Sequence, residues 1–407
     1  MTPLHLRRVT GSRAVVMRVG LVALIVAPVV ALTGCGRNGR PASPVPPFPP
    51  APPIVQFDDH SVHWGWSNDW TRLRVDVRGH IELTDDDRDV KSVSPNGYFE
   101  LSSRRWLSLF GRRYEVRGGA DGTVSRRFSV NGVERPVDAQ TRAWIGDVIQ
   151  RLVRNGFDAD ARVARILARQ GPPGVLDEIS RISSGFVKAI YFGQLFRQAR
   201  LDGTNAQRAL GQAGQEIHSS FELARVLMAF VDNTTIDEML GAAFVGATDS
   251  LRSDFEHARV LTRLLARQPR TPTLAKVALA SSLQIGSDFE KSRVLAGFVQ
   301  AYRVDGTTRD PFFAVVRTIQ SDFERHRVLS LLAQRKDLDD DTMLGIVQAA
   351  SSIGSDFHKT QVLLQVVSSH PDGVATKQAL LEAASRIGSG HERGLVLSAM
   401  LREGTLH

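Results

Sequence analysis

The stretch that decides the fold runs from Ile285 to Leu295 and reads IGSDFEKSRVL. Near copies begin at Arg252 (RSDFEHARVL), Gln320 (QSDFERHRVL) and Gly354 (GSDFHKTQVL). One aromatic column recurs every 34 residues, at Phe221, Phe255, Phe289, Phe323 and Phe357, with His391 on the next step. A fixed period between about 20 and 50 residues is typical of stacked supersecondary units. The sequence therefore predicts a solenoid of repeated units.

Each unit reads as two helices. Ser253, Ser287 and Ser321 precede Asp-Phe-Glu, and Ser219 and Ser389 also have Glu three residues later. In such a capping box the serine accepts from an early backbone N–H, and the glutamate reaches back to the N–H of the cap residue. The aspartate complements the helix dipole. A first helix is thus expected to start at each serine.

The repeated apolar columns predict the core of the solenoid. The first helix is expected to bury the phenylalanine, the Val-Leu pair five and six residues later, and an apolar residue nine later. These last residues are Phe230, Leu264, Phe298, Leu332, Val366 and Met400. In the second helix, Phe312, Val315, Val316 and Ile319 follow the i, i+3, i+4, i+7 pattern of one buried face. One hairpin cannot cover its own apolar faces, but a stack of hairpins can.

The repeat weakens toward both ends of the array. Residues 182–186 match the unit, and residues 165–182 look like a shortened earlier hairpin. Only a first helix fits after residue 389. We expect about seven or eight hairpins in an α-solenoid spanning residues 138–407. The tetratricopeptide signature is missing, so the hairpins are expected to be HEAT-like.

A different pattern occupies residues 54–137. Leu73 to Val77 alternates apolar and polar residues, as do Tyr114 to Val116 and Phe128 to Val130. Asn131-Gly132 between two short runs is a strong hairpin signal. The predicted fold class is therefore α+β by segments, with a small antiparallel β domain followed by an all-α solenoid.

The N-terminal residues indicate export. Residues 1–34 combine four arginines with a 14-residue apolar run, which is the length of a signal peptide. Leu32-Thr33-Gly34-Cys35 resembles the bacterial lipobox, and so predicts lipidation of Cys35 and a lipid-anchored protein of the bacterial cell envelope. The alternative is a secreted or singly anchored protein with an incidental cysteine. Residues 35–53 hold eight prolines and are expected to form an extended linker.

The charge distribution argues against nucleic acid as a partner. The formal net charge is +8, and half of it lies in residues 1–34. No basic stripe, the usual footprint of a nucleic-acid-binding protein, stands out downstream.

The sequence evidence for a metal site is weak. His60 and His63 lie beside two aspartates, but residues three apart on a strand face opposite ways. Residues 85–89 hold four aspartates without the spacing of a calcium loop, which favours a solvated acidic turn. Residues 339–341, three more aspartates, are expected to begin a helix. We therefore predict no metal and no cofactor.

Two sets of residues are candidate binding groups. Trp64, Trp66 and Trp70 could form an exposed aromatic platform for a glycan, or the core of the small sheet. Four arginines lie four residues after each phenylalanine, at Arg225, Arg259, Arg293 and Arg327. They could line a groove for acidic ligands, or bond to the aspartates of neighbouring units, which we favour. The repeated phenylalanines themselves are expected in the core.

Several stretches together resemble a known bacterial region. They are DVKSVSPNGYFEL (89–101), RRYEVRGGADG (112–122), VNGVERPVDAQTRAWI (130–145), ISSGFVKAIYF (182–192) and SSFELARVL (219–227). They resemble an accessory region attached to some BlaR-like antirepressor membrane zinc peptidases, over about residues 80–400. The resemblance implies a β module followed by helical repeats in a sensing or docking role. The H-E-x-x-H motif of the peptidase has no match, since His391-Glu392 is followed by Leu395.

The function expected from these patterns is non-catalytic. The sequence has no G-x-S-x-G motif, no phosphate loop and no cysteine besides Cys35. We predict a protein-binding scaffold that docks another envelope protein along the solenoid. The alternative is a ligand- or glycan-sensing lipoprotein that binds through the tryptophans, and an unrecognised hydrolase is a third, weaker hypothesis.

Overall fold

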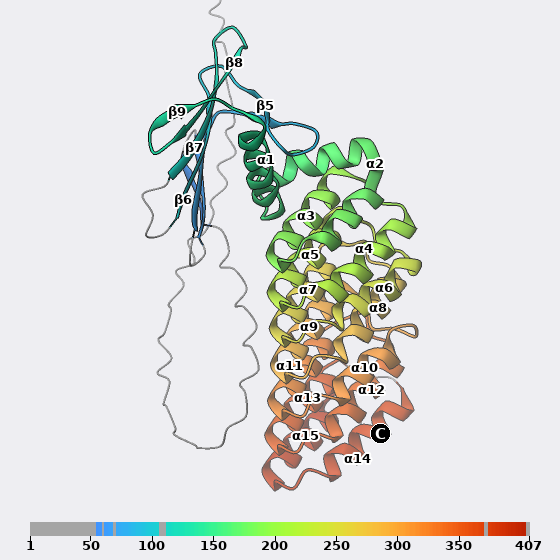
Figure 1. Cartoon of the computed structure of the whole chain (residues 1–407). Coiled ribbons are helices and arrows are strands. Elements are labelled where there is room, and N and C mark those ends of the chain that lie inside the picture. The colour runs from blue at the N-terminus through green and yellow to red at the C-terminus, as the bar shows by residue number, and fades with distance from the viewer. Residues whose placement is uncertain (1–53, 59–60, 68–70, 106–110, 370–372, 404–407) are drawn as a thin grey trace, which may run out of the picture. The chain divides into compact units, whose positions relative to one another are not determined.

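The computed structural model describes residues 54–58, 61–67, 71–105, 111–369 and 373–403. Within these residues, short antiparallel strands are followed by helices in tandem (Figure 1). The predicted fold class, a small antiparallel β domain followed by a helical solenoid, is confirmed. The strands end at Arg135 and the first helix begins at Ala139.

The described strands form one seven-stranded antiparallel sheet and one two-stranded ribbon. The sheet has the order β1 (Ile54–Asp58), β2 (Ser61–Ser67), β3 (Thr71–Arg78), β6 (Tyr98–Arg105), β7 (Gly111–Gly118), β8 (Val124–Val130) and β9 (Val133–Arg135). The ribbon pairs β4 (Ile81–Leu83) with β5 (Val90–Val93). Asn131 and Gly132 have φ of 52° and 80° and join β8 to β9. These are the left-handed conformations of a two-residue hairpin turn, so that prediction is confirmed.

The sheet and the first helix share one core. Phe99, Leu101 and Tyr114 of the sheet are fully buried in the same cluster as Ile149 and Leu152 of α1 (Ala139–Arg154). Helix α1 begins where Asp138 accepts a hydrogen bond from the Thr141 N–H. A small sheet cannot hide its apolar face alone, and α1 supplies the cover.

The helices after α1 form two rows. The first helices of the units are α3 (Gly185–Gln198), α5 (Ser220–Asn233), α7 (Asp254–Arg267), α9 (Asp288–Ala301), α11 (Asp322–Ala333), α13 (Asp356–Val367) and α15 (Gly390–Arg402). The second helices are α4 (Gly203–Glu216), α6 (Glu238–Thr248), α8 (Pro272–Ser282), α10 (Arg309–Arg317), α12 (Asp340–Ser351) and α14 (Val374–Ser385). Within each row every helix contacts the next (Figure 1). The predicted stacking of hairpins is confirmed, and the last described helix, α15, belongs to the first row.

Helix α2 (Ala159–Arg181) contains the predicted shortened hairpin. Gly171 has φ 65° and ψ −168°, which no helix accommodates, and Pro172 and Pro173 follow it. The chain therefore turns there, and the two parts of α2 act as two short helices.

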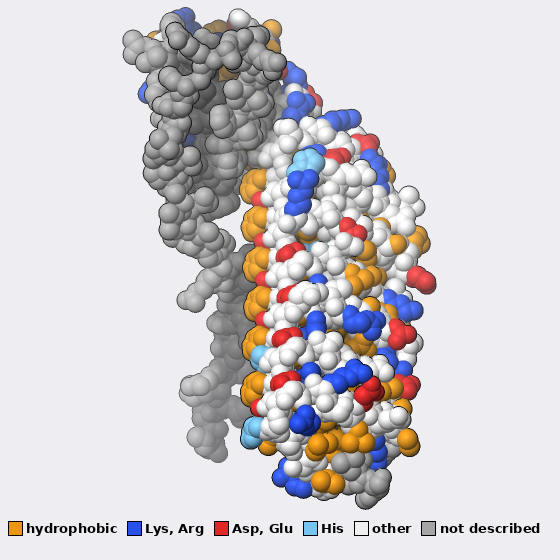
Figure 2. All heavy atoms as spheres, turned by 90° about the horizontal axis from the view of Figure 1, so that it is seen from below, with side chains coloured by type: hydrophobic (Ala, Val, Ile, Leu, Met, Phe, Trp, Pro, Cys, Tyr) orange, Lys and Arg blue, Asp and Glu red, His pale blue; other side chains and the backbone are white. Residues whose placement is uncertain are grey.

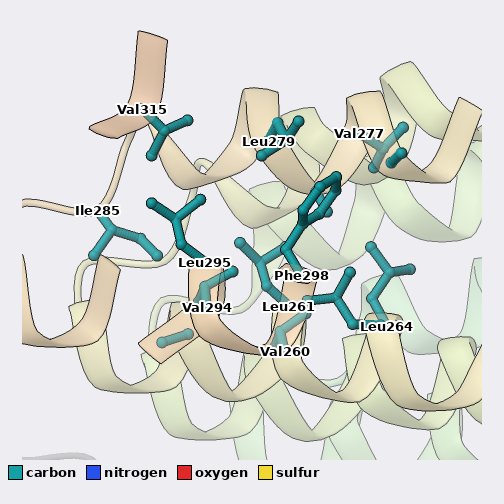
Figure 3. Close-up of a cluster of buried hydrophobic side chains, with 14 of the residues drawn as sticks. Val260, Leu261, Leu264, Val277, Leu279, Ile285, Val294, Leu295, Phe298 and Val315 are labelled. Carbon is teal, nitrogen blue, oxygen red and sulfur yellow. The ribbon is translucent and has the colours of Figure 1, made fainter. Parts of the chain in front are cut away.

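The interior between the two rows is the predicted core. Three repeated columns are buried: the Val-Leu pairs, the apolar residues nine positions after each phenylalanine, and the isoleucine or leucine four positions before it. Leu397 is only partly buried. Figure 3 shows Phe298 of α9 pointing from the first row toward Leu279 and Val277 of α8. Side chains from two successive hairpins, α7 with α8 and α9 with α10, meet at this point.

The phenylalanine column is not in that core, and this prediction is wrong. Phe221, Phe255, Phe289, Phe323 and Phe357 are each 51% to 56% exposed. The reason is helical geometry: at about 100° per residue, the buried Val-Leu pair lies about 140° and 240° round the helix from the phenylalanine. The phenylalanine therefore points away from the buried Val-Leu pair and faces solvent.

Serine caps begin the first helices as predicted, but the glutamates act differently. Each serine Oγ accepts from the N–H three residues later, at 3.3 to 3.4 Å. The N–H of the cap residue instead donates to the aspartate of the preceding unit. The pairs are Ser287 to Asp254, Ser321 to Asp288, Ser355 to Asp322 and Ser389 to Asp356, at 2.7 to 2.8 Å. We call this column the aspartate ladder, and it ties each first helix to the next.

Replacement of Asp288 by alanine should therefore destabilise the stack. Its carboxylate accepts from the N–H groups of Gln320 at 2.9 Å and Ser321 at 2.7 Å. Loss of both bonds should lower the free energy of unfolding by about 1 to 3 kcal/mol in a urea titration. Asp310→Ala is the matched control, because Asp310 lies in the first turn of α10 and is exposed. An equal loss for both variants would mean that Asp288 acts only through the helix dipole.

A column of buried basic residues lies on the first helices, two positions after the phenylalanine of α3, α7, α9, α11 and α13, whereas α5 has Leu223 at this position. Lys188, His257, Lys291, Arg325 and Lys359 are all buried. The Arg325 guanidinium donates to the backbone carbonyl oxygens of Ile319 and Ser352, where second helices end. Cations are stabilised at helix C-termini, so these contacts favour the charge of Arg325 despite its burial. The column was not predicted, although the 34-residue spacing of His257, Lys291, Arg325 and Lys359 is visible in the sequence.

His257 makes the stability depend on pH. Its Nε2 lies 2.7 Å from the Ser281 Oγ, and burial lowers its pKa to about 4, against the opposing charge of Asp254. Because the unfolded chain takes up this proton near pH 6.5 and the folded chain does not, stability should fall as pH drops from 6.5 toward 4. The loss approaches about 3 kcal/mol. Thermal unfolding of His257→Gln should lack this component, and an unchanged pH profile in that variant would contradict the assignment.

Candidate functional site

The exposed phenylalanines form one continuous feature, which we call the phenylalanine ridge. Its members, Phe221, Phe255, Phe289, Phe323 and Phe357, occupy the second position of α5, α7, α9, α11 and α13. Since these helices contact one another in order, the rings repeat along one edge of the array. Figure 2 shows this edge as a line of hydrophobic side chains with acidic side chains between them. Five half-exposed phenylalanines in register are unusual on a solvated surface.

The arginine column joins the rings to one another. The Arg293 guanidinium lies 5.4 Å from the ring centre of Phe255, in the preceding unit. Arg327 lies 5.4 Å from the ring of Phe289 in the same way. Arg225 lies 5.7 Å from Phe186, the equivalent residue of α3. Cations over aromatic faces at these distances are attractive, so the ridge alternates rings and guanidinium groups.

Each of these arginines also pairs with a glutamate of its own helix. Arg225 to Glu222, Arg259 to Glu256 and Arg293 to Glu290 are each 2.7 Å, and Arg327 to Glu324 is 3.0 Å. The glutamate side chains are nearly buried, and desolvation raises the pKa of Glu222 against the charge of Arg225. The favoured pairing of arginines with aspartates of neighbouring units is therefore wrong. The aspartates bond to backbone instead, and the glutamates take the arginines.

The ridge changes character after Phe323. The next unit has His358 and Gln361 in place of the glutamate and arginine. The His358 ring stacks on His326 with centres 5.1 Å apart, and it touches Phe323 and Phe357 edge-on at 6.0 and 5.5 Å. Burial and the neighbouring His358 lower the pKa of His326. The edge thus stays aromatic here, with Gln361 in place of the arginine.

The charges along the ridge balance. The Arg-Glu pairs are neutral, and the half-exposed aspartates of the ladder lie beside the rings at Asp254, Asp288, Asp322 and Asp356. The buried Lys291, Arg325 and Lys359 on the same helices offset much of this acidity. An apolar strip flanked by balanced charge suits an elongated protein segment better than a polyanion.

The other predicted sites are placed as follows. Asp87 does not belong to a solvated turn: it is buried and pairs with Arg162 and Arg165, both at 2.7 Å. Asp339 caps α12 by accepting from the Thr342 N–H, as predicted. Among the described residues no group of three or more potential metal ligands lies together.

The tryptophan platform and the N-terminal predictions stay untested. Trp64 and Trp66 lie on β2, but their side chains fall outside the described part of the structure. Trp70, His60, Cys35 and the proline-rich linker lie outside the described residues altogether. In the part of the chain that is described, no helix is both long and apolar enough to cross a membrane.

No family model, curated protein or solved structure matches this chain. The geometry of the ridge and of the helices that carry it is therefore the basis for assigning a function.

Proposed function

We propose that this protein is a non-catalytic docking scaffold, in which the phenylalanine ridge binds a segment of another protein. The observation that carries the proposal is the half-exposure of the equivalent phenylalanine on five successive first helices. Core packing does not require these rings, because the buried columns already fill the space between the rows.

The apolar area of the ridge is large enough for binding. A half-exposed phenylalanine leaves about 100 Å² accessible, so five leave about 500 Å². This is near the largest patch found on a typical soluble monomer. Covering it would contribute roughly 12 kcal/mol before the costs of association are subtracted. Stacked helical hairpins commonly present such extended binding surfaces.

We further propose that the scaffold works in the bacterial cell envelope, anchored by a lipid on Cys35. The basic leader, the apolar run and the lipobox-like Leu32 to Cys35 support this location. The resemblance to the accessory region of BlaR-like proteins supports a docking role without peptidase chemistry. The expected partner is therefore another envelope protein.

Photo-crosslinking in cells tests the docking role. A photoreactive phenylalanine analogue at position 289 should capture a discrete partner, whereas the same analogue at exposed Lys276 on α8 should not. Serine at Phe255 and Phe323 should abolish capture at 289 while leaving the circular dichroism melt within about 0.5 kcal/mol of the parent chain. Equal capture at both positions, or none at 289, would refute the ridge as a docking surface.

A further inference from the structure

We infer that the hollow between α3 and α5 binds a carboxylate from an acidic, apolar peptide segment of the partner. The inference rests on the proposed function, because the hollow adjoins the phenylalanine ridge and adds a specific chemistry to it. Arg225 belongs to both features: it lines the hollow and lies 6.0 Å from the Phe221 ring. A segment that covers the upstream end of the ridge therefore reaches the hollow.

The hollow has a volume of about 400 Å³ and is lined by three first helices. The lining residues are Ala189, Ile190, Gly193 and Arg197 of α3, Arg225, Met228, Ala229 and Asp232 of α5, and Arg263 of α7. Three guanidinium groups thus face one carboxylate. We call this feature the arginine hollow.

The existing ion pairs do not balance all of the positive charge in the arginine hollow. Arg263 bonds to Asp232 at 2.7 Å, and Arg267 approaches the same carboxylate at 3.4 Å. Arg225 is paired with Glu222. Arg197 forms no ion pair or hydrogen bond with any residue that the structure describes. A guanidinium with free donors beside a second arginine favours a carboxylate, which it can bind through two parallel bonds.

The floor of the hollow explains why the ligand must also be apolar. Ile190, Met228 and Ala229 are half-buried there, and methionine adapts its shape to different ligands. Above Gly193 the space is empty, since no atom lies within 4 Å of where a Cβ would be. An open hollow continuous with a ridge suits a peptide that passes through it, rather than an enclosed small molecule.

An anionic lipid has the same two chemical features, but the ridge argues against it. Half-exposed aspartates flank the ridge at Asp254, Asp288, Asp322 and Asp356. A negatively charged bilayer laid along this edge would meet a repeated row of carboxylates. A peptide can place one acidic side chain at Arg197 and apolar side chains along the rings, and so avoids that repulsion.

The test uses the full chain and a displayed library of random 12-residue peptides. We expect selected peptides to carry Asp or Glu beside apolar residues, and to bind about tenfold more weakly when that acid is changed to its amide. Gly193→Leu fills the hollow and, being in a helix interior, should stabilise the fold. Gly211→Leu on α4 is the matched control, because its Cβ also meets nothing within 4 Å.

The inference predicts about tenfold weaker peptide binding by Gly193→Leu and by Arg197→Gln, with Gly211→Leu unchanged. It is overturned if selected peptides lack acids, if Gly193→Leu binds them normally, or if no peptide is selected. It is also overturned if phosphatidylglycerol vesicles, and not peptides, bind in a manner that Gly193→Leu abolishes. Peptides lost on Phe255→Ser but retained by Gly193→Leu would leave the docking function standing and remove only the carboxylate site.

Discussion

Replacing Phe298 by alanine is expected to lower the free energy of unfolding by about 3 to 5 kcal/mol, whereas Phe289→Ala should change it by less than about 1 kcal/mol. The two phenylalanines lie on the same helix, α9, nine residues apart. Phe298 is fully buried and stacks on Tyr302 with ring centres 5.0 Å apart, while Phe289 is 52% exposed. Deleting the first leaves a cavity between the rows, and deleting the second removes surface.

Urea unfolding and hydrogen exchange of α9 measure this difference. A repeat array can unfold in parts, so the local exchange of α9 amides shows whether the loss is confined to neighbouring units. Leu295→Ala, also fully buried on α9, is the positive control. Similar losses for Phe289 and Phe298 would show that the ridge is part of the core after all.

The second large effect is expected at Asp87, where alanine should cost about 3 kcal/mol or more. The Asp87 carboxylate bonds to Arg162 and Arg165 at 2.7 Å, and Arg162 also bonds to Glu178 and Tyr191. All of these side chains are largely buried. Removing the shared carboxylate leaves two buried guanidinium groups without a full set of partners.

Asp85→Ala is the control for this prediction. Asp85 pairs with Arg169, but the two side chains are 66% and 47% exposed, so the pair should contribute less than about 1 kcal/mol. Thermal unfolding of the two variants at pH 7 gives the comparison directly. A small loss at Asp87, similar to that at Asp85, would mean that solvent reaches the network and screens it.

The exposure of the phenylalanine ridge can be predicted from the sequence. The 34-residue period indicates the stack, but apolarity alone does not show which of the repeated columns is buried. The angular position of Phe289 relative to Val294 and Leu295 places it on the opposite side of the helix. A helical projection of one unit would have separated the apolar column that faces the core from the one that faces solvent. A repeated phenylalanine outside the buried stripe is itself a signal for a binding surface.

Local patterns in the sequence determined the serine caps, the Asn131-Gly132 turn, the buried Val-Leu columns and the change from strands to helices. Each depends on residues that are close in the chain, so spacing and side-chain chemistry suffice to predict it. Only the tertiary structure decided the partner of Asp288, the pairing of Arg293 with Glu290 and the arginine hollow. For each arginine, the competing partners are an aspartate of the neighbouring unit and a glutamate of its own helix, which carry the same charge. The first lies about one repeat away in the sequence, and the second lies within one helix turn. Which of them meets the side chain depends on how far each helix is displaced and rotated against the next, and a period in the sequence does not fix that displacement.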